Sequence, residues 1–251
     1  MEALLDYDLL LVVVVGFAAQ LVDGALGMAY GATASSLLLG LGVPPAVSSA
    51  TVHAAECFTT GASAISHHTF GNIDKRLFRR LLLPGMLGAA IGAYVLVQLP
   101  GDAIKPWIAG YLLLLGLMIL AKAFREIVSK RVTSHLIPLG FVGGLIDAIG
   151  GGGWGPIVTT NLLARGNEAR CTVGTVNAVE FFVTFTASVV FLITLGVQHW
   201  QIVVALGVGG VIAAPVGGWL VKHLNPRWLM LVVGLLVVGL SLRTLYLTVW
   251  S

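Results

Sequence analysis

Four acidic residues, Asp23, Glu56, Asp147 and Glu180, lie inside stretches of the sequence that are otherwise strongly apolar. A carboxyl group is costly to bury in such surroundings, and where one occurs it often exchanges a proton or holds a polar ligand. The four residues form two matched pairs, because Asp147 follows Asp23 and Glu180 follows Glu56 at the same spacing of 124 residues. This pattern predicts proton chemistry at two equivalent positions of a duplicated chain.

Each glutamate shares one side of an expected helix with other polar residues, since spacings of i, i+3, i+4 and i+7 place side chains on one helix face. The first such face consists of His53, Glu56, Cys57 and Thr60. The equivalent face of the later segment consists of Asn177, Glu180 and Thr184. We therefore expect His53, Cys57 and Asn177 to contact a polar substrate beside the two glutamates.

The composition indicates the surroundings of these residues. Hydrophobic residues make up 57% of the 251 residues and charged residues only 10%, whereas a soluble domain carries about 25% charged residues. Such a chain cannot cover its apolar surface as a soluble domain, and the same numbers exclude disorder. A formal net charge of only +3, with no basic domain, argues against nucleic-acid binding. The sequence predicts a polytopic membrane protein, and its length leaves no room for a catalytic domain outside the membrane.

Ten apolar stretches follow one another along the chain, and two of them, 31–43 and 154–164, are too short for ordinary membrane spans. We therefore predict an all-α integral membrane protein with about eight to ten membrane segments and no further domain in 1–251. Matched Asp, Glu, Thr and Gly residues at one offset divide it into two repeats, 1–125 and 126–251.

Positive charges predict the orientation of the two repeats. If each half crosses the membrane five times and the N-terminus is outside, 12 of the 14 Lys and Arg residues, Lys122 among them, flank the spans on the inner side. An odd number of crossings in each half makes the repeats inverted, which is a common architecture of transporters.

A glycine-rich interruption precedes each short stretch, and the second contains four consecutive glycines, Gly150–Gly153. This run cannot continue a stable helix, because each glycine costs about 1 kcal/mol relative to alanine. A broken helix at membrane depth must line a cavity or protein, and the N–H groups of the following half-helix favour an anion. We expect the substrate to contact residues of both breaks and the hydroxyl residues that follow them, namely Gly27, Tyr30, Thr33, Ser35, Gly151, Gly152, Gly153, Trp154 and Thr159.

The same residues could also take part in metal binding or in peptide-bond hydrolysis. His53 and Glu56 have the spacing of half a metal site, as a metal-ion carrier would need, but the second half supplies no further histidine. Asp23 and Asp147 are matched, as in an aspartyl intramembrane protease, but the surrounding motifs of those enzymes are absent. More simply, the two aspartates cap half-helices or transfer protons. We expect no enzyme activity, no cofactor and no resident metal.

Several of these motifs resemble the sulfite exporter TauE/SafE family, also called the toluene-sulfonate uptake permease family. They are Gly16-Phe17 with Leu21 and Asp23 before the first break, Gly140-Phe141 with Gly150–Gly153 and Pro156 in the second half, and the segment Gly71-Asn72-Ile73-Asp74. The resemblance covers nearly the whole chain. The first break departs from the pattern in being poorer in glycine.

The resemblance implies a multi-pass carrier of the bacterial or archaeal inner membrane, with around eight spans. It implies that the substrate is a small sulfur-containing anion, such as sulfite, a sulfonate or sulfoacetate, and that transport is coupled to protons. The carboxyl groups of Glu56, Glu180, Asp23 and Asp147 are the expected proton carriers. The expected partners are the anion, protons and membrane lipid, with a homodimer left open. A passive anion channel is the main alternative to a carrier.

Overall fold

The computed structural model describes residues 9–124, 135–164, 167–196, 199–220 and 226–250, and within these ranges the chain is helical without β-strands. The first half contains α1 (Leu9–Leu26), α2 (Tyr30–Gly40), α3 (Pro45–Thr69), α4 (Lys75–Gln98) and α5 (Gly101–Ala123). The second half contains α6 (Leu136–Gly150), the π-helical turn η2 (Gly155–Thr159), α7 (Thr160–Ala164), α8 (Ala169–Leu195), α9 (Trp200–Leu220) and α10 (Pro226–Trp250). The all-α prediction is confirmed.

The lengths and composition of these helices are those of a polytopic membrane protein. The helices α4, α5, α8 and α10 contain apolar segments long enough to cross a membrane, and α1, α6 and α9 contain shorter apolar segments. The helix α2 has 11 residues, while η2 and α7 have 5 each. At a rise of about 1.5 Å per residue, neither short segment alone crosses a hydrocarbon core of about 30 Å. Helices are interrupted at both predicted glycine breaks.

The helix α4 begins with charged residues ahead of its apolar segment. The side chain of Asp74 accepts hydrogen bonds from the backbone N–H groups of Arg76 at 2.8 Å and Leu77 at 3.1 Å, which makes it the N-cap of the helix. The residues 75–80, four of which are Lys or Arg, are therefore the first turns of α4. The basic segment 125–131 lies outside the described residues.

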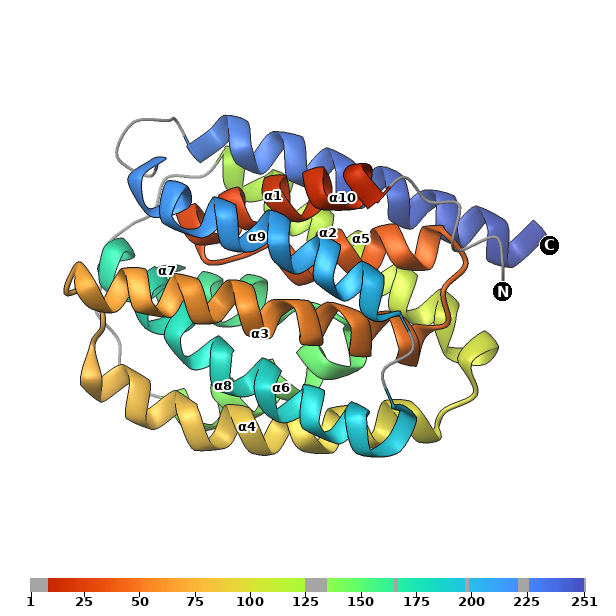
Figure 1. The fold of residues 1–251 in the computed structure, drawn as a ribbon, viewed down its shortest axis with the longest axis horizontal. Helices are drawn as coiled ribbons and strands as arrows, with labels where there is room; N and C mark the ends of the chain where they lie inside the picture. The colour runs from red at the N-terminus through yellow and green to blue at the C-terminus, as the bar shows by residue number, and fades with distance from the viewer. Residues whose placement is uncertain (1–8, 125–134, 165–166, 197–198, 221–225, 251) are drawn as a thin grey trace.

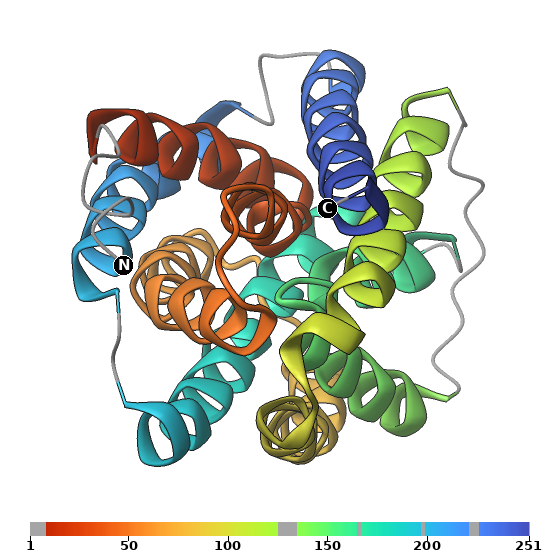
Figure 2. The same cartoon turned by 90° about the vertical axis from the view of Figure 1, so that its right-hand side faces the viewer.

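The helices run side by side along the long axis of the molecule (Figure 1). The main pairs are α1 with α9, α4 with α6, α5 with α10 and α3 with α8. Seen along the bundle, α1 lies beside α9 and α5 beside α10 (Figure 2). The order of elements in the first half recurs in the second, with α1 corresponding to α6 and α4 to α9. The packed pair α1 with α9 is therefore the counterpart of the packed pair α6 with α4. The repeat boundaries and the inverted orientation of the repeats stay predictions.

Glycines bring two of these pairs into backbone contact. A Cβ atom added to Gly16 of α1 would lie 2.5 Å from the Leu206 carbonyl oxygen of α9. One added to Gly88 of α4 would lie 2.1 Å from the Phe141 carbonyl oxygen of α6. Because lipid tails are as apolar as the side chains, membrane helices associate through such close packing. The two closely packed pairs hold α1 and α6, and thereby the breaks that follow them.

Candidate functional site

The two glycine breaks meet in the interior of the bundle. A Cβ atom added to Gly31 would lie 2.7 Å from the Cα atom of Gly152, so the two backbones touch with only hydrogen atoms between them. The hydroxyl of Thr159 donates a hydrogen bond of 2.7 Å to the carbonyl oxygen of Gly27, which ties the second break to the first. Segments more than 120 residues apart in the sequence thus form one junction.

Hydroxyl groups satisfy the backbone carbonyl groups that the second break exposes. Ser35 donates a hydrogen bond to the carbonyl oxygen of Gly151, and Tyr111 of α5 donates one of 3.0 Å to the carbonyl oxygen of Gly152. A Cβ atom added to Gly153 would lie 2.0 Å from the hydroxyl oxygen of Tyr111, so a side chain at this position would displace the tyrosine ring. Non-helical backbone at membrane depth is stable only with partners of this kind.

An aspartate caps the half-helix that follows each break. One carboxylate oxygen of Asp147 accepts a hydrogen bond of 2.8 Å from the backbone N–H of Trp154. The carboxylate of Asp23 accepts one from the backbone N–H of Tyr30. These two N–H groups, which we expected to be free for an anion, therefore bind the chain's own side chains. This capping arrangement is the simpler of the roles that the sequence left open for the two aspartates.

The imidazole of His53 joins α3 to the second break. Its Nε2 atom lies 3.2 Å from Oδ2 of Asp147, and its Nδ1 atom lies 2.8 Å from the carbonyl oxygen of Ser49. The hydroxyl of Ser49 donates a hydrogen bond of 2.7 Å to the carbonyl oxygen of Ala148, beside Asp147. Both side chains of the His53–Asp147 pair are almost completely buried, with exposed fractions of 0% and 2%.

The four acidic residues that the sequence singled out, Asp23, Glu56, Asp147 and Glu180, come together in the structure. All are buried, and Glu180 lies within electrostatic range of the other three. Among the described residues, their charged neighbours are one another and the imidazole of His53, which lies beside Asp147 and Glu56. One oxygen each of Asp23, Glu56 and Glu180 accepts no hydrogen bond from the part of the chain that the structure describes. The cluster is thus acidic and incompletely paired.

The two aromatic residues at the breaks act as anchors. The hydroxyl of Tyr30 donates a hydrogen bond of 3.1 Å to the carbonyl oxygen of Leu206 in α9, and the indole N–H of Trp154 donates one of 3.2 Å to the carbonyl oxygen of Val176 in α8. Exposed fractions of 1% for Tyr30 and 0% for Trp154 leave neither ring open to a ligand in this conformation. Thr33 is also buried, and its hydroxyl has no partner within the described chain.

The remaining expected substrate contacts lie along the interface between α3 and α8. The sulfur of Cys57 is 3.4 Å from the hydroxyl oxygen of Ser188. The side-chain amide of Asn177 donates a hydrogen bond of 3.1 Å to the carbonyl oxygen of Val173 and accepts one of 3.2 Å from Ser63. In this conformation, Cys57 and Asn177 therefore bind other groups of the protein, and a substrate role for them stays a prediction.

A basic residue that we had assigned only to the flank of a span reaches the junction. The ammonium group of Lys122, in the last turn of α5, hydrogen-bonds the hydroxyl of Thr160 and lies 3.5 Å from the sulfur of Met28. Thr160 follows the second break and Met28 lies in the first. Lys122 makes no ion pair with any residue that the structure describes. No feature of its own sequence neighbourhood distinguished it, because the contact depends on how α5 packs.

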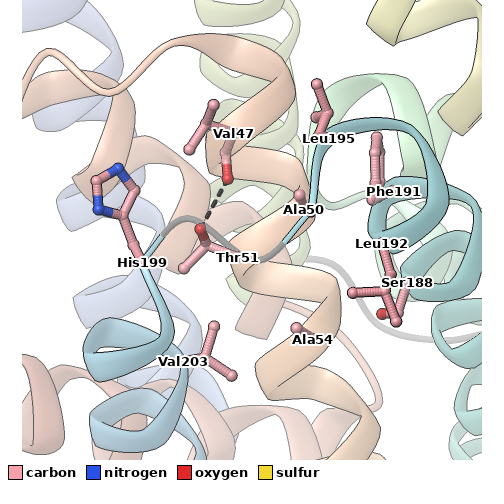
Figure 3. Close-up of a pocket in the computed structure, with 11 residues that line it drawn as sticks. Val47, Ala50, Thr51, Ala54, Ser188, Phe191, Leu192, Leu195, His199 and Val203 are labelled. Atoms are coloured by element: carbon pink, nitrogen blue, oxygen red, sulfur yellow. Dashed lines mark hydrogen bonds between the residues drawn. The ribbon is translucent and has the colours of Figure 1, made fainter.

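A small pocket lies between α3, α8 and the start of α9, as Figure 3 shows. Its volume is about 30 Å³, and mostly apolar side chains line it. Phe191 lines the pocket, and its ring centre lies 5.9 Å from that of His53. Phe191 therefore packs between the pocket and the buried acidic cluster.

The family model described as sulfite exporter TauE/SafE matches residues 12–244. The chain belongs to the TauE/SafE family. It is also similar to the probable membrane transporter protein YtnM of Bacillus subtilis (strain 168), with 46% identity over 241 residues, which cover 92% of this chain and 80% of that protein. No solved structure gives a significant match.

Membership of the TauE/SafE family confirms the resemblance that the sequence motifs indicated. Both the family description and the name of the relative are those of transporters. Together with the apolar helices, they show a multi-pass membrane transporter, which agrees with the expectation that the chain is not an enzyme.

Proposed function

We propose that this transporter moves a small sulfur-containing anion, of the sulfite or sulfonate type, across the bacterial or archaeal inner membrane in exchange or symport with protons. The anion class comes from the family description. The observation that carries the proposal is the cluster of four buried acidic residues beside the junction of the two broken helices.

The acidic cluster favours proton coupling for an electrostatic reason. Buried carboxylates that lack a cationic partner are strongly destabilised, so they are retained as neutral acids or lose their protons only when the surroundings change. Asp23, Glu56 and Glu180 have no Lys or Arg among the described charged neighbours. A conformational change that exposes the junction to one side of the membrane would therefore release or collect protons there.

Lys122 supplies the positive charge that an anionic substrate needs. Its ammonium group lies next to residues from both breaks and has no acidic partner in the described chain. A hydrogen bond between a charged donor and a sulfonate or sulfite oxygen is stronger than one between neutral groups. We place the anion beside Lys122 and Thr160, from where it would enter the junction when the breaks separate.

Transport by purified protein in liposomes tests the proposal. We expect radiolabelled sulfite or sulfoacetate to accumulate inside the liposomes above its external concentration when a proton gradient is imposed, either directed inward or directed outward. This accumulation should disappear when a protonophore is added. Protein-free liposomes are the control. A passive anion channel would equilibrate the anion without accumulating it, and that result, or the absence of any flux of these anions, would overturn the proposal.

Substituting Lys122 tests where the anion binds. We expect Lys122→Gln to raise the KM of the transported anion at least tenfold, because a hydrogen bond from a charged group contributes about 1.5–3 kcal/mol and about 1.4 kcal/mol is a factor of ten. The matched control is Lys75→Gln, since Lys75 is an exposed residue in the first turn of α4. Equal KM values for the two variants would show that Lys122 does not bind the anion.

A further inference from the structure

Three of the residues at the junction have side chains that metal ions bind. His53, Glu56 and Asp147 each offer one ligand atom, and these three atoms lie within 4.8 Å of one another. Nε2 of His53 and Oδ2 of Asp147 are already 3.2 Å apart. Two ligands at about 2.1 Å from one tetrahedral ion would be separated by about 3.4 Å, so this pair has the spacing of two ligands of a single ion.

The hydrogen bonds around His53 indicate which ring nitrogen can bind a metal. Nδ1 lies 2.8 Å from the carbonyl oxygen of Ser49, which can only accept, so Nδ1 carries a hydrogen. In the neutral imidazole this tautomer presents the lone pair of Nε2 to Oδ2 of Asp147, and either a proton or a metal ion can join these two atoms. A backbone carbonyl that binds the other ring N–H is the usual support of a histidine that ligates a metal.

The carboxylates of Asp147 and Glu56 also have an oxygen atom available for a metal ion. The second oxygen of Asp147 is held by the N–H of Trp154 at 2.8 Å, which fixes the direction of the oxygen that faces His53. Glu56 is 2% exposed, and its Oε2 atom has no hydrogen-bond partner in the described chain. Two carboxylates and a neutral imidazole carry a charge of −2, which one divalent ion cancels. Because the site is buried, neutralising this charge stabilises the folded protein strongly.

We propose that His53, Glu56 and Asp147 form a binding site for one divalent transition-metal ion of the zinc or manganese class. Imidazole nitrogen together with carboxylate oxygen suits these ions better than it suits magnesium or calcium, which prefer oxygen ligands alone. Three protein ligands leave at least one coordination position open for water or a further ligand. The ligand atom of Glu56 lies within 4.8 Å of those of the other two residues.

Metal binding to the purified, detergent-solubilised protein tests this site. We expect the wild-type chain to bind one equivalent of Zn²⁺ or Mn²⁺ in equilibrium dialysis, with a melting temperature that rises with the metal concentration, and to bind Mg²⁺ at least tenfold more weakly. His53→Asn should lower the Zn²⁺ affinity at least tenfold. Asparagine is chosen because Asn177 occupies the equivalent position of the second half, so the helix accommodates it.

The matched control is His68→Asn, which removes an exposed histidine from the end of the same helix and should leave the affinity unchanged. Equal affinities of His53→Asn and the wild type, or a loss of affinity in His68→Asn alone, would overturn the proposal. Should His53→Asn fail to fold, X-ray absorption of the Zn²⁺-loaded wild type decides. One imidazole with oxygen ligands supports the site, and any other ligand set contradicts it. Neither measurement needs a transported anion or a proton gradient, so the result is independent of the function proposed above.

Discussion

Replacing Gly152 with alanine is expected to prevent the two breaks from meeting and to destabilise the whole transporter. The added Cβ atom would lie 2.2 Å from the backbone nitrogen of Ala32 and 2.3 Å from the carbonyl carbon of Gly31. Both contacts are with backbone, which cannot rotate away as a side chain does, so the half-helices must separate. We expect a loss of at least about 3 kcal/mol, above the usual range for overpacking.

Thermal unfolding in detergent, followed with size-exclusion chromatography, measures this effect. Gly152→Ala should melt at least about 6 °C below the wild type, as a loss of this size implies for a chain of this length, or should not be recovered as a monodisperse species. Gly110→Ala in α5 is the control, because no atom lies within 4 Å of its added Cβ atom. It should leave the melting temperature unchanged or raise it. A wild-type melting temperature for Gly152→Ala would mean that the breaks do not touch.

Replacing Glu56 with glutamine is expected to stop proton-driven accumulation of the anion. The amide has nearly the same shape as the carboxyl group, so the fold is retained, but it cannot release and rebind a proton. We expect the initial rate of accumulation driven by a proton gradient to fall at least tenfold. Exchange of labelled for unlabelled anion across the membrane should persist, because exchange needs no net movement of protons.

The comparison of accumulation with exchange separates a role in coupling from a role in binding. Loss of both activities would assign Glu56 to substrate binding instead. The control is Asp102→Asn, which removes an exposed carboxyl group from the first turn of α5 and should change neither activity. Glu180→Gln tests the equivalent position of the second half. If both glutamine variants keep proton-driven accumulation, these glutamates do not couple transport to protons.

The linear pattern of the chain was sufficient for the fold class and for the position of its interruptions. Hydrophobic stretches limit where helices lie, and four consecutive glycines cannot continue a helix in any context, so the break before Trp154 followed from local chemistry. The helix boundaries were harder to predict from the sequence. The charged residues 75–80 joined α4 because a single side chain, Asp74, caps the helix ahead of them, and hydropathy does not register a cap.

Matched residues at a constant offset predicted which groups are functional candidates, but no pattern in the sequence indicated how closely these groups pack. The buried acidic residues Asp23, Glu56, Asp147 and Glu180 were recognisable from their apolar surroundings. That all four lie in one cluster, and that the aspartates bind the N–H groups we expected to be free, depends on contacts between the two halves.

By itself, the sequence therefore determined a membrane-embedded helical protein with two broken helices, buried acids and the motifs of its family. These properties come from the cost of placing a given residue in lipid or in a helix, and that cost is local. Only the tertiary structure decided that Gly31 touches Gly152, that His53 faces Asp147 and that Lys122 reaches both breaks. Such contacts join residues about 40 to 120 positions apart, and they arise from close packing of whole helices, which no local pattern encodes.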